Sequence, residues 1–328
     1  MSYLADSMQV PVEREVSRIT QWMKQYVFHE FKRRGGVVGV SGGIDSAVVL
    51  ALSVHAFGQN RVTALFMPEK DSSPESQLMA GEVVSRFGVN FIVNEITPAL
   101  TALGCYDHLM AAIRETFPDY DPDHDKVKLV LPENLLEKPG LNVFSLALLR
   151  EGQPEQRKIL SPRAYLGIVA ASNMKQRTRM LNLYFHAEKL NYAVIGTSNR
   201  NEHDQGFFVK YGDGGADLQP IRHLLKSQIY QLAKHLDVPQ SIIGRTPTTD
   251  TYSAGSTQEE FYFRVPFDLL DKIWLGMDRG MCTAEIAKDL DLSEEQVDRV
   301  LADLLQKKRT TEYLRTIPLS LEPIPPES

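Results

Sequence analysis

Residues 36–52 read GVVGVSGGIDSAVVLAL, and the short polar segment SGGIDS at residues 41–46 decides how the rest of the chain is interpreted. The apolar residues 37–40 before it are typical of a buried strand, and the longer apolar run at 45–57 is typical of a helix. Two glycines, two serines and one carboxylate therefore lie in a turn that leads from a strand into a helix.

The same alternation continues along the chain. Further strands are predicted at 61–67, 90–93 and 192–197, and helices at 12–28, 74–87, 163–189 (as one helix or two) and 226–236. Strands that alternate with helices of this length indicate βαβ units. We therefore predict an α/β fold with a Rossmann-like, doubly wound, mostly parallel sheet.

Two regions depart from this alternation. Residues 104–160 are rich in Pro, Asp, Glu and Lys and are predicted to form an insertion of loops and short helices. The Pro-rich tail at 318–328 is expected to be extended and poorly ordered. We expect an α/β domain over residues 1–271, interrupted by the insertion, and a helical C-terminal extension with its tail over residues 272–328.

The composition is that of an ordinary globular protein, with 43% hydrophobic and 24% charged residues. A net charge of −6 gives the molecule as a whole no attraction for nucleic acids or anionic membranes. No apolar run approaches the roughly 20 residues that span a bilayer, and the N-terminus lacks the features of a signal peptide. We expect a cytoplasmic protein with no membrane or nucleic-acid partner.

The SGGIDS turn is predicted to bind phosphate. Open α/β sheets bind ligands at the carboxyl ends of their strands, glycines allow close approach of the backbone, and the N–H groups of a helix start attract anions. The turn matches neither GxxxxGK[ST] nor GxGxxG. Because Asp45 would repel a phosphate at about 4 Å, its carboxylate predicts a cation between the two.

SGGIDS resembles the pyrophosphate loop of the ATP pyrophosphatases, which cleave ATP between the α and β phosphates and adenylate a substrate. Five further segments resemble motifs of the NAD synthetases, in the same order: NMKQRTRM at 173–180, GTSN at 196–199 followed by Glu202, GFFVKYGDGGAD at 206–217, LLK at 224–226 and PTTD at 247–250. The resemblance covers about residues 12–271, apart from the insertion. It implies the adenine nucleotide alpha hydrolase-like version of the Rossmann-like fold.

The resemblance to ammonia-dependent NAD synthetases implies that ATP and Mg²⁺ adenylate the carboxylate of deamido-NAD, and that ammonia then displaces AMP. Asp45 and Glu202 would hold Mg²⁺, and Asp45, Lys226 and Asp213 are the expected catalytic residues, with Asp213 helping to deprotonate ammonium. The residues that would bind ATP are Gly39, Val40, Ser41, Gly42, Gly43, Ile44, Asp45, Ser46, Thr197, Lys226 and Thr248.

The resemblance also implies a second set of residues, for deamido-NAD: Arg177, Arg179, Lys210, Asp213, Asp217, Lys307 and Lys308. Arg177 and Arg179 are two residues apart on a predicted helix, so their side chains diverge by about 200°. We therefore expect one of them to serve the substrate while the other pairs elsewhere.

Free ammonia is the expected nitrogen donor, unless a partner subunit delivers it. Glutamine-dependent relatives carry a separate glutaminase domain, whereas only about 40 residues precede the SGGIDS loop here. Neither Cys105 nor Cys282 stands in a recognisable Cys-His-carboxylate context, so both thiols are predicted to be buried and inert.

A homodimer is expected, because the family forms homodimers and the NMKQRTRM helix fits that arrangement. The helix continues through residues 180–185 with apolar side chains on nearly all sides. One face should bury against the sheet, and a second face needs another partner. That partner is either a second copy of the chain or the insertion folding back.

Two other functions remain open at this stage. The family's LGxxYxxLD motif is altered within residues 258–271, and a C-terminal His-Lys has become Lys307-Lys308, which leaves open an amide ligase of the same fold with a different carboxylate substrate. Residues 283–304 predict two short helices around a turn, as in a DNA-binding regulator that would use the ATP-binding domain as a sensor. The second of these helices is dominated by acidic residues, which argues against DNA.

Overall fold

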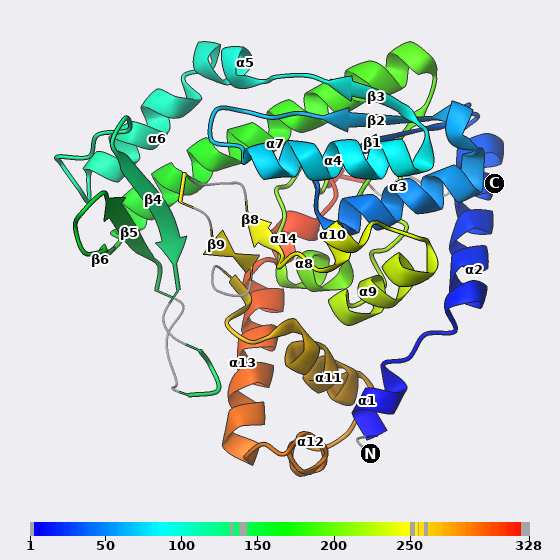
Figure 1. The fold of residues 1–328 in the computed structure, drawn as a ribbon. Helices are drawn as coiled ribbons and strands as arrows, with labels where there is room; N and C mark the ends of the chain where they lie inside the picture. The colour runs from blue at the N-terminus through cyan, green and yellow to red at the C-terminus, as the bar shows by residue number, and fades with distance from the viewer. Residues whose placement is uncertain are drawn as a thin grey trace.

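The structure is a computed structural model that describes residues 3–131, 134–137, 143–249, 253–254, 256–258 and 262–322 (Figure 1). Its centre is a parallel four-stranded sheet in the order β3-β2-β1-β7. The strands are β1 (Gly36–Gly39), β2 (Val62–Phe66), β3 (Asn90–Val93) and β7 (Ala193–Ile195). The predicted Rossmann-like parallel sheet is confirmed, and the SGGIDS loop leaves the carboxyl end of its inner strand β1.

Helices cover both faces of the sheet. Successive strand residues point to opposite faces, so the apolar side chains of these strands must be buried on both sides. Val38 and Ala64 belong to the core on one face, while their neighbours Val37 and Leu65 belong to the core on the other. The first core is completed by α2 (Val12–Lys24), α3 (Ile44–Phe57), α4 (Pro74–Phe87) and α9 (Lys226–His235), and the second by α5 (Thr97–Ala102) and α7 (Pro162–Leu190) (Figure 1).

Helix α7 is one continuous helix of 29 residues, about 44 Å long at 1.5 Å per residue. Its N-cap is Ser161, whose hydroxyl accepts a hydrogen bond from the backbone N–H of Ala164 at 3.1 Å. It ends at Asn191, which adopts the left-handed conformation with φ 56°. Its C-terminal half packs on β1 and β7, and its N-terminal half packs on the insertion.

The insertion is more ordered than we expected from its composition. It contains α6 (Cys105–Arg114) and a three-stranded antiparallel sheet made of β4 (Asp125–Val130), β5 (Ser145–Arg150) and β6 (Gln156–Ile159). The prediction of loops and short helices alone was therefore wrong. In β4, Val127 and Leu129 are buried against α6 and α7, and the lysines that alternate with them face outward or lie part-buried.

The C-terminal region forms an apolar cluster separate from the two cores of the sheet. Its helices are α11 (Phe267–Asp278), α12 (Thr283–Leu290), α13 (Glu294–Thr310) and α14 (Glu312–Arg315), and they pack with α1 (Tyr3–Ser7) (Figure 1). The two helices predicted around a turn at 283–304 are present as α12 and α13. The boundary expected after residue 271 falls inside α11. The described part of the tail, residues 318–322, belongs to no helix or strand.

Short elements connect these layers: η1 (Gln25–Glu30), which extends α2, η2 (Gln59–Arg61), α8 (Arg200–Gln205), α10 (Gln240–Ile243), β8 (Thr248–Thr249) and β9 (Ser256–Thr257).

Cys105 is buried as expected, but Cys282 is exposed, so the expectation of two buried thiols holds for only one of them. Within the described ranges, no helix combines the length and apolar character needed to cross a membrane.

Candidate active site

One cavity of about 570 Å³ lies at the carboxyl ends of β1 and β7 and collects most of the residues singled out from the sequence. Fifteen of them line it: Gly39, Val40, Ser41, Gly42, Gly43, Ile44, Asp45, Ser46, Arg177, Arg179, Thr197, Glu202, Lys210, Asp213 and Lys226. The fold thus brings together the SGGIDS loop, the α7 arginines and the glycine-rich segment after α8.

The SGGIDS loop is held in shape by its own hydroxyls and glycines. The Ser41 hydroxyl accepts a hydrogen bond from the Gly43 N–H at 3.2 Å, and the Ser46 hydroxyl donates to the Gly43 carbonyl at 2.9 Å. Gly42 has φ +80°, and a Cβ there would lie 2.6 Å from the Ser76 carbonyl oxygen. Glycine is therefore required at residue 42, and the N-terminus of α3 opens directly onto the cavity, where it favours an anion.

A buried ion pair lies beneath this loop. The ammonium of Lys226, the first residue of α9, is fully buried and donates to one carboxylate oxygen of Asp45. The side-chain amide of Asn199 donates to the other oxygen at 3.0 Å. Burial alone would lower the pKa of Lys226, but the charges of Asp45 and Glu202 raise it above its ordinary value. Lys226 therefore stays charged in this site.

A second carboxylate, Glu202, lies in the same cavity. It accepts a hydrogen bond from the backbone N–H of Asn199 at 3.2 Å, as part of the capping box that starts α8. Burial, and then the charge of Asp45, raise the pKa of Glu202 to about 8. Glu202 is therefore largely protonated at neutral pH in the protein alone.

This pair of carboxylates fits a magnesium ion. Mg²⁺ prefers hard oxygen ligands, and it commonly takes one or two carboxylates with phosphate oxygens and water. A divalent cation would also supply the positive charge that Glu202 lacks. Among the residues in the described ranges, no group of three or more His, Cys, Asp or Glu side chains could hold a metal ion. Asp45 and Glu202 would thus be a two-residue contribution to the coordination shell.

The α7 side of the cavity is positively charged. Arg177 donates to the Lys210 carbonyl at 3.2 Å, and Arg179 donates to the Met67 carbonyl at 3.1 Å. Both arginines line the cavity, although we expected only one of them to serve a substrate there. Each of these two bonds is to a neutral carbonyl and positions a guanidinium group on the cavity wall, and the charge of Arg179 also acts on the carboxylate of Asp213.

The glycine-rich segment after α8 supplies Lys210 and Asp213. The Asp213 carboxylate accepts the Val209 N–H at 2.8 Å, and burial raises its pKa to about 6. The Lys210 ammonium donates to the carbonyls of Tyr313 and Thr316, at 3.1 and 2.7 Å. Lys210 therefore ties this segment to the C-terminal end of the described chain.

Three residues expected to bind the second substrate do not line the cavity. Asp217 accepts hydrogen bonds from the Tyr184 hydroxyl at 2.9 Å and from the Val194 N–H at 2.8 Å. Lys307 is buried and pairs with Asp303 at 2.7 Å, and Lys308 is exposed. Thr248 lies in β8, and its side chain falls outside the described part of the structure, as does Asp250 of the PTTD motif.

Other lining residues were not predicted from the sequence. The insertion contributes Leu129 and Phe144, and the C-terminal region contributes Tyr262, Thr311 and Leu314. On α7, four lining residues share one face at four-residue spacing: Tyr165, Val169, Asn173 and Arg177. Because Arg177 was predicted to line the site, this helical spacing could have identified the other three. Phe144 and Tyr165 stack with their ring centroids 4.8 Å apart.

Comparison with known proteins gives consistent matches. The NAD synthase family model matches residues 15–116 and 153–318, and so omits β4 and β5 of the insertion. An "NH(3)-dependent NAD(+) synthetase" of Rhizobium meliloti (strain 1021) is 46% identical over 323 residues, which cover 98% of this chain and 96% of that protein. The protein of the same name from Thermotoga maritima is 36% identical over 90% of this chain and 95% of its own length.

Solved structures show the same fold. The NMN synthetase of Francisella tularensis superposes with a TM-score of 0.65 at 23% identity, over 95% of this chain and 99% of that one. The NH3-dependent NAD synthetase of Campylobacter jejuni gives a TM-score of 0.62 at 21% identity, over 96% of this chain and 100% of that one. At these identities the similarity concerns the fold alone.

The raised pKa of Glu202 predicts a pH-dependent stability. A carboxyl whose pKa is near 8 in the folded protein and near 4.5 in the unfolded chain adds stability below pH 4.5, which is lost as the pH rises through 8. Glu202→Gln should remove this loss of stability. Without divalent cations, the unfolding free energy of the variant should therefore increase relative to that of the wild type as the pH rises, with a limiting slope of about 1.4 kcal/mol per pH unit.

Urea denaturation at several pH values between 5 and 9 measures this difference. Glu285→Gln is the matched control, because Glu285 is also the capping-box carboxylate of a helix, α12, but its pKa is lowered by a hydrogen bond from the backbone N–H of Cys282. The control should follow the wild-type pH dependence over this range. Parallel curves for wild type and Glu202→Gln would contradict the proton on Glu202.

Proposed function

We propose, since the chain belongs to the NAD synthase family, that it makes NAD by ATP-dependent amidation of deamido-NAD with ammonia. The nicotinate carboxylate attacks the α-phosphorus of ATP, and the bond to the bridging oxygen breaks, so that pyrophosphate leaves. Ammonia then attacks the acyl carbon of the adenylate and displaces AMP. The observation that carries this proposal is that one cavity joins a phosphate-binding loop to buried and cavity-lining cations.

The SGGIDS loop and Lys226 would bind the phosphates of ATP. The helix start and the Ser41 hydroxyl provide hydrogen-bond donors for phosphate oxygens, while the Ser46 hydroxyl holds the loop by donating to the Gly43 carbonyl. Lys226 provides a fixed charge in a water-poor environment, where it stabilises developing negative charge more strongly than in bulk water. Thr197, at the end of β7, lies on the cavity wall beside them.

Asp45 and Glu202 would hold Mg²⁺. The bound ion would neutralise the triphosphate and stabilise the departing pyrophosphate. Asp45 stays fixed for this purpose by the hydrogen bonds from Lys226 and Asn199, so little reorganisation is needed when nucleotide arrives.

The residues that would bind the carboxylate substrate and ammonium come from α7 and the segment after α8. Arg177 and Arg179 provide positive charge for the carboxylate of deamido-NAD, which must approach the anionic α-phosphate. Asp213, with a pKa of about 6, is mostly ionised at neutral pH. It can orient an ammonium ion and accept its proton when the C–N bond forms. These assignments rest on the cavity position of each residue.

The direct test is an assay with purified protein, ATP, Mg²⁺, ammonium chloride and either deamido-NAD or nicotinate mononucleotide, in which the release of AMP measures turnover of both substrates and NAD is identified as the product from deamido-NAD. We expect kcat/KM for deamido-NAD to exceed that for nicotinate mononucleotide at least tenfold, and glutamine to replace ammonium poorly. Faster turnover of the mononucleotide, or of another carboxylate, would assign the chain to the alternative function of a same-fold amide ligase.

The metal assignment predicts the effect of Asp45→Asn. The substitution keeps the shape of the side chain but removes its charge, which is needed for the cation and for Lys226. We expect kcat/KM for MgATP to fall more than tenfold, equivalent to about 1.4 kcal/mol or more. Asp268→Asn is the control, because Asp268 also lies in the first turn of a helix, α11, but is exposed and outside the cavity. A near-normal Asp45→Asn enzyme would contradict the assignment.

A homodimer built on α7 is also proposed. The insertion covers the N-terminal half of α7, where Gly167 lies against Ala112 of α6. Farther along the helix, Leu181 and Phe185 remain 71% and 58% exposed. The insertion therefore covers part of this helix, and we infer that a second copy of the chain covers the exposed C-terminal half. A two-fold contact would cover the same apolar patch on both chains.

Sedimentation equilibrium at micromolar concentration tests the dimer. Phe185→Asp should raise the dissociation constant at least tenfold, because it places a charge in the contact. Leu78→Asp on α4 is the control, since Leu78 is 73% exposed on a different helix. A wild-type protein that sediments as a clean monomer of 37.0 kDa would overturn the proposal.

A cytoplasmic location is the remaining part of the proposal. It is supported by the free thiols of Cys105 and Cys282, since thiols of this kind persist in a reducing compartment.

A further inference from the structure

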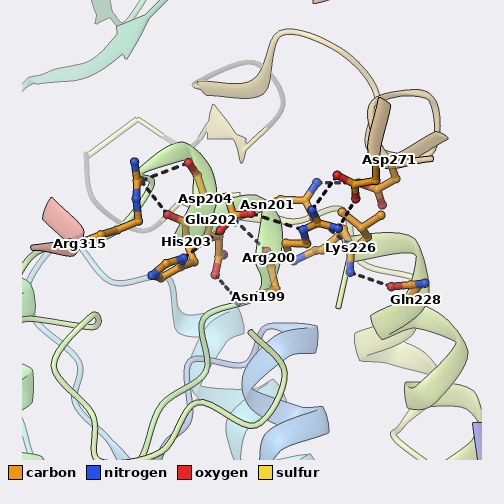
Figure 2. A network of polar contacts seen from close by, with 12 residues as sticks. Asn199, Arg200, Asn201, Glu202, His203, Asp204, Lys226, Gln228, Asp271 and Arg315 are labelled. Carbon is orange, nitrogen blue, oxygen red and sulfur yellow. Dashed lines mark hydrogen bonds and ion pairs between the residues drawn. The ribbon is translucent and has the colours of Figure 1, made fainter. Parts of the chain in front are cut away.

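Helix α9 caps its own start only in part. The Gln228 side chain accepts the Leu225 N–H at 3.0 Å, but the N-cap residue Leu225 has no side-chain acceptor for the first backbone N–H groups of the helix. Two other elements supply the acceptors instead. The Lys226 N–H donates to the side-chain oxygen of Asn201 on α8 at 3.0 Å, and the Ser227 N–H donates to Asp271 on α11 at 2.8 Å (Figure 2).

Asp271 connects these groups into one network. Its second carboxylate oxygen accepts the side-chain N–H of Asn201 at 2.6 Å, and the first also accepts the Ser227 hydroxyl at 2.7 Å (Figure 2). Asp271, Asn201 and Lys226 are all 0% exposed. Water cannot replace a lost partner in such a place, so each donor must keep its acceptor.

The network bears directly on the charged groups of the cavity. Asn201 immediately precedes Glu202 on α8, and Lys226 is the residue whose ammonium holds Asp45. Asp271 itself does not line the cavity. Its carboxylate nevertheless fixes the starts of the two helices that carry Glu202 and Lys226.

We propose that Asp271 is a positioning residue for the reaction, acting through Asn201 and Ser227 to place Lys226 and Glu202 around Asp45. This inference rests on the proposed function, because it assigns Asp271 a role in turnover. It makes α11, the helix within which the boundary expected after residue 271 falls, a part of the support of the active site.

An exchange of the two side chains tests this role. In Asp271→Asn the new amide faces the amide of Asn201, or else turns away from Ser227, so one buried donor loses its acceptor. In Asn201→Asp two carboxylates face each other. The double variant Asn201→Asp/Asp271→Asn restores every hydrogen bond with the same net charge. The carboxylate introduced at position 201 accepts from the Lys226 N–H and from the amide introduced at position 271, and the oxygen of that amide accepts from Ser227.

We expect each single variant to lower kcat at least tenfold, and the double variant to return to within about threefold of wild type. MgATP affinity, measured by isothermal titration calorimetry, should follow the same pattern of loss and rescue. Circular dichroism and thermal melting show whether each variant is folded. A folded double variant that is as impaired as the worse single variant would overturn the proposal, and so would single variants with lower melting temperatures but normal kcat.

Asp289→Asn is the matched control. Asp289 on α12 accepts the first backbone N–H groups of α1, from Tyr3 at 2.8 Å and Leu4 at 2.9 Å, so it caps a distant helix in the same way but far from the cavity. Its substitution should lower stability and leave kcat unchanged. A wild-type protein that binds MgATP but makes no NAD would refute the proposed function alone, because the binding pattern of the variants still decides the role of Asp271.

Discussion

The ion pair between Lys226 and Asp45 is the constraint on which the arrangement of the site depends. Transfer of an ammonium ion from water to a protein interior costs several kcal/mol, and an opposite charge offsets this only with good geometry and further hydrogen bonds. Here α3 supplies the carboxylate, the segment after β7 supplies Asn199, and α9 supplies the lysine. The parallel sheet brings these elements to one edge, because β1 and β7 are neighbours and end side by side.

Much of this arrangement could be predicted because its signals are local. The apolar run before SGGIDS, the glycines within it and the apolar run after it each depend on a few adjacent residues. The insertion was mispredicted for the opposite reason. In β4, Lys126 and Lys128 alternate with Val127 and Leu129, and the period-two pattern was hidden by a composition typical of loops. Its three strands pair across up to 25 residues of chain, from Asp125 to Arg150, which no local signal reports.

The charge of a side chain was easier to predict than the partner toward which it points. Lys307 carries the positive charge that a substrate-binding role needs, but packing turns its ammonium toward Asp303 and the Tyr262 carbonyl. Asp217 lies in a well-matched motif, yet its carboxylate accepts a backbone N–H of β7. Asp271 was the last residue of a weak motif match, and its contacts come from α8 and α9, more than 40 positions away. Such contacts depend on the tertiary fold.

The inserted sheet has a consequence for inhibitor design. Leu129 and Phe144 reach the cavity from a segment that the family model does not match, and Phe144 stacks on Tyr165 to form an apolar wall. A compound that binds only at the SGGIDS loop makes no use of this inserted segment. A compound extended onto the wall gains apolar contact with Leu129 and Phe144, which lie outside the residues matched by the family model. Selectivity against proteins of the family that lack this segment is therefore best sought at the Phe144–Tyr165 end of the cavity.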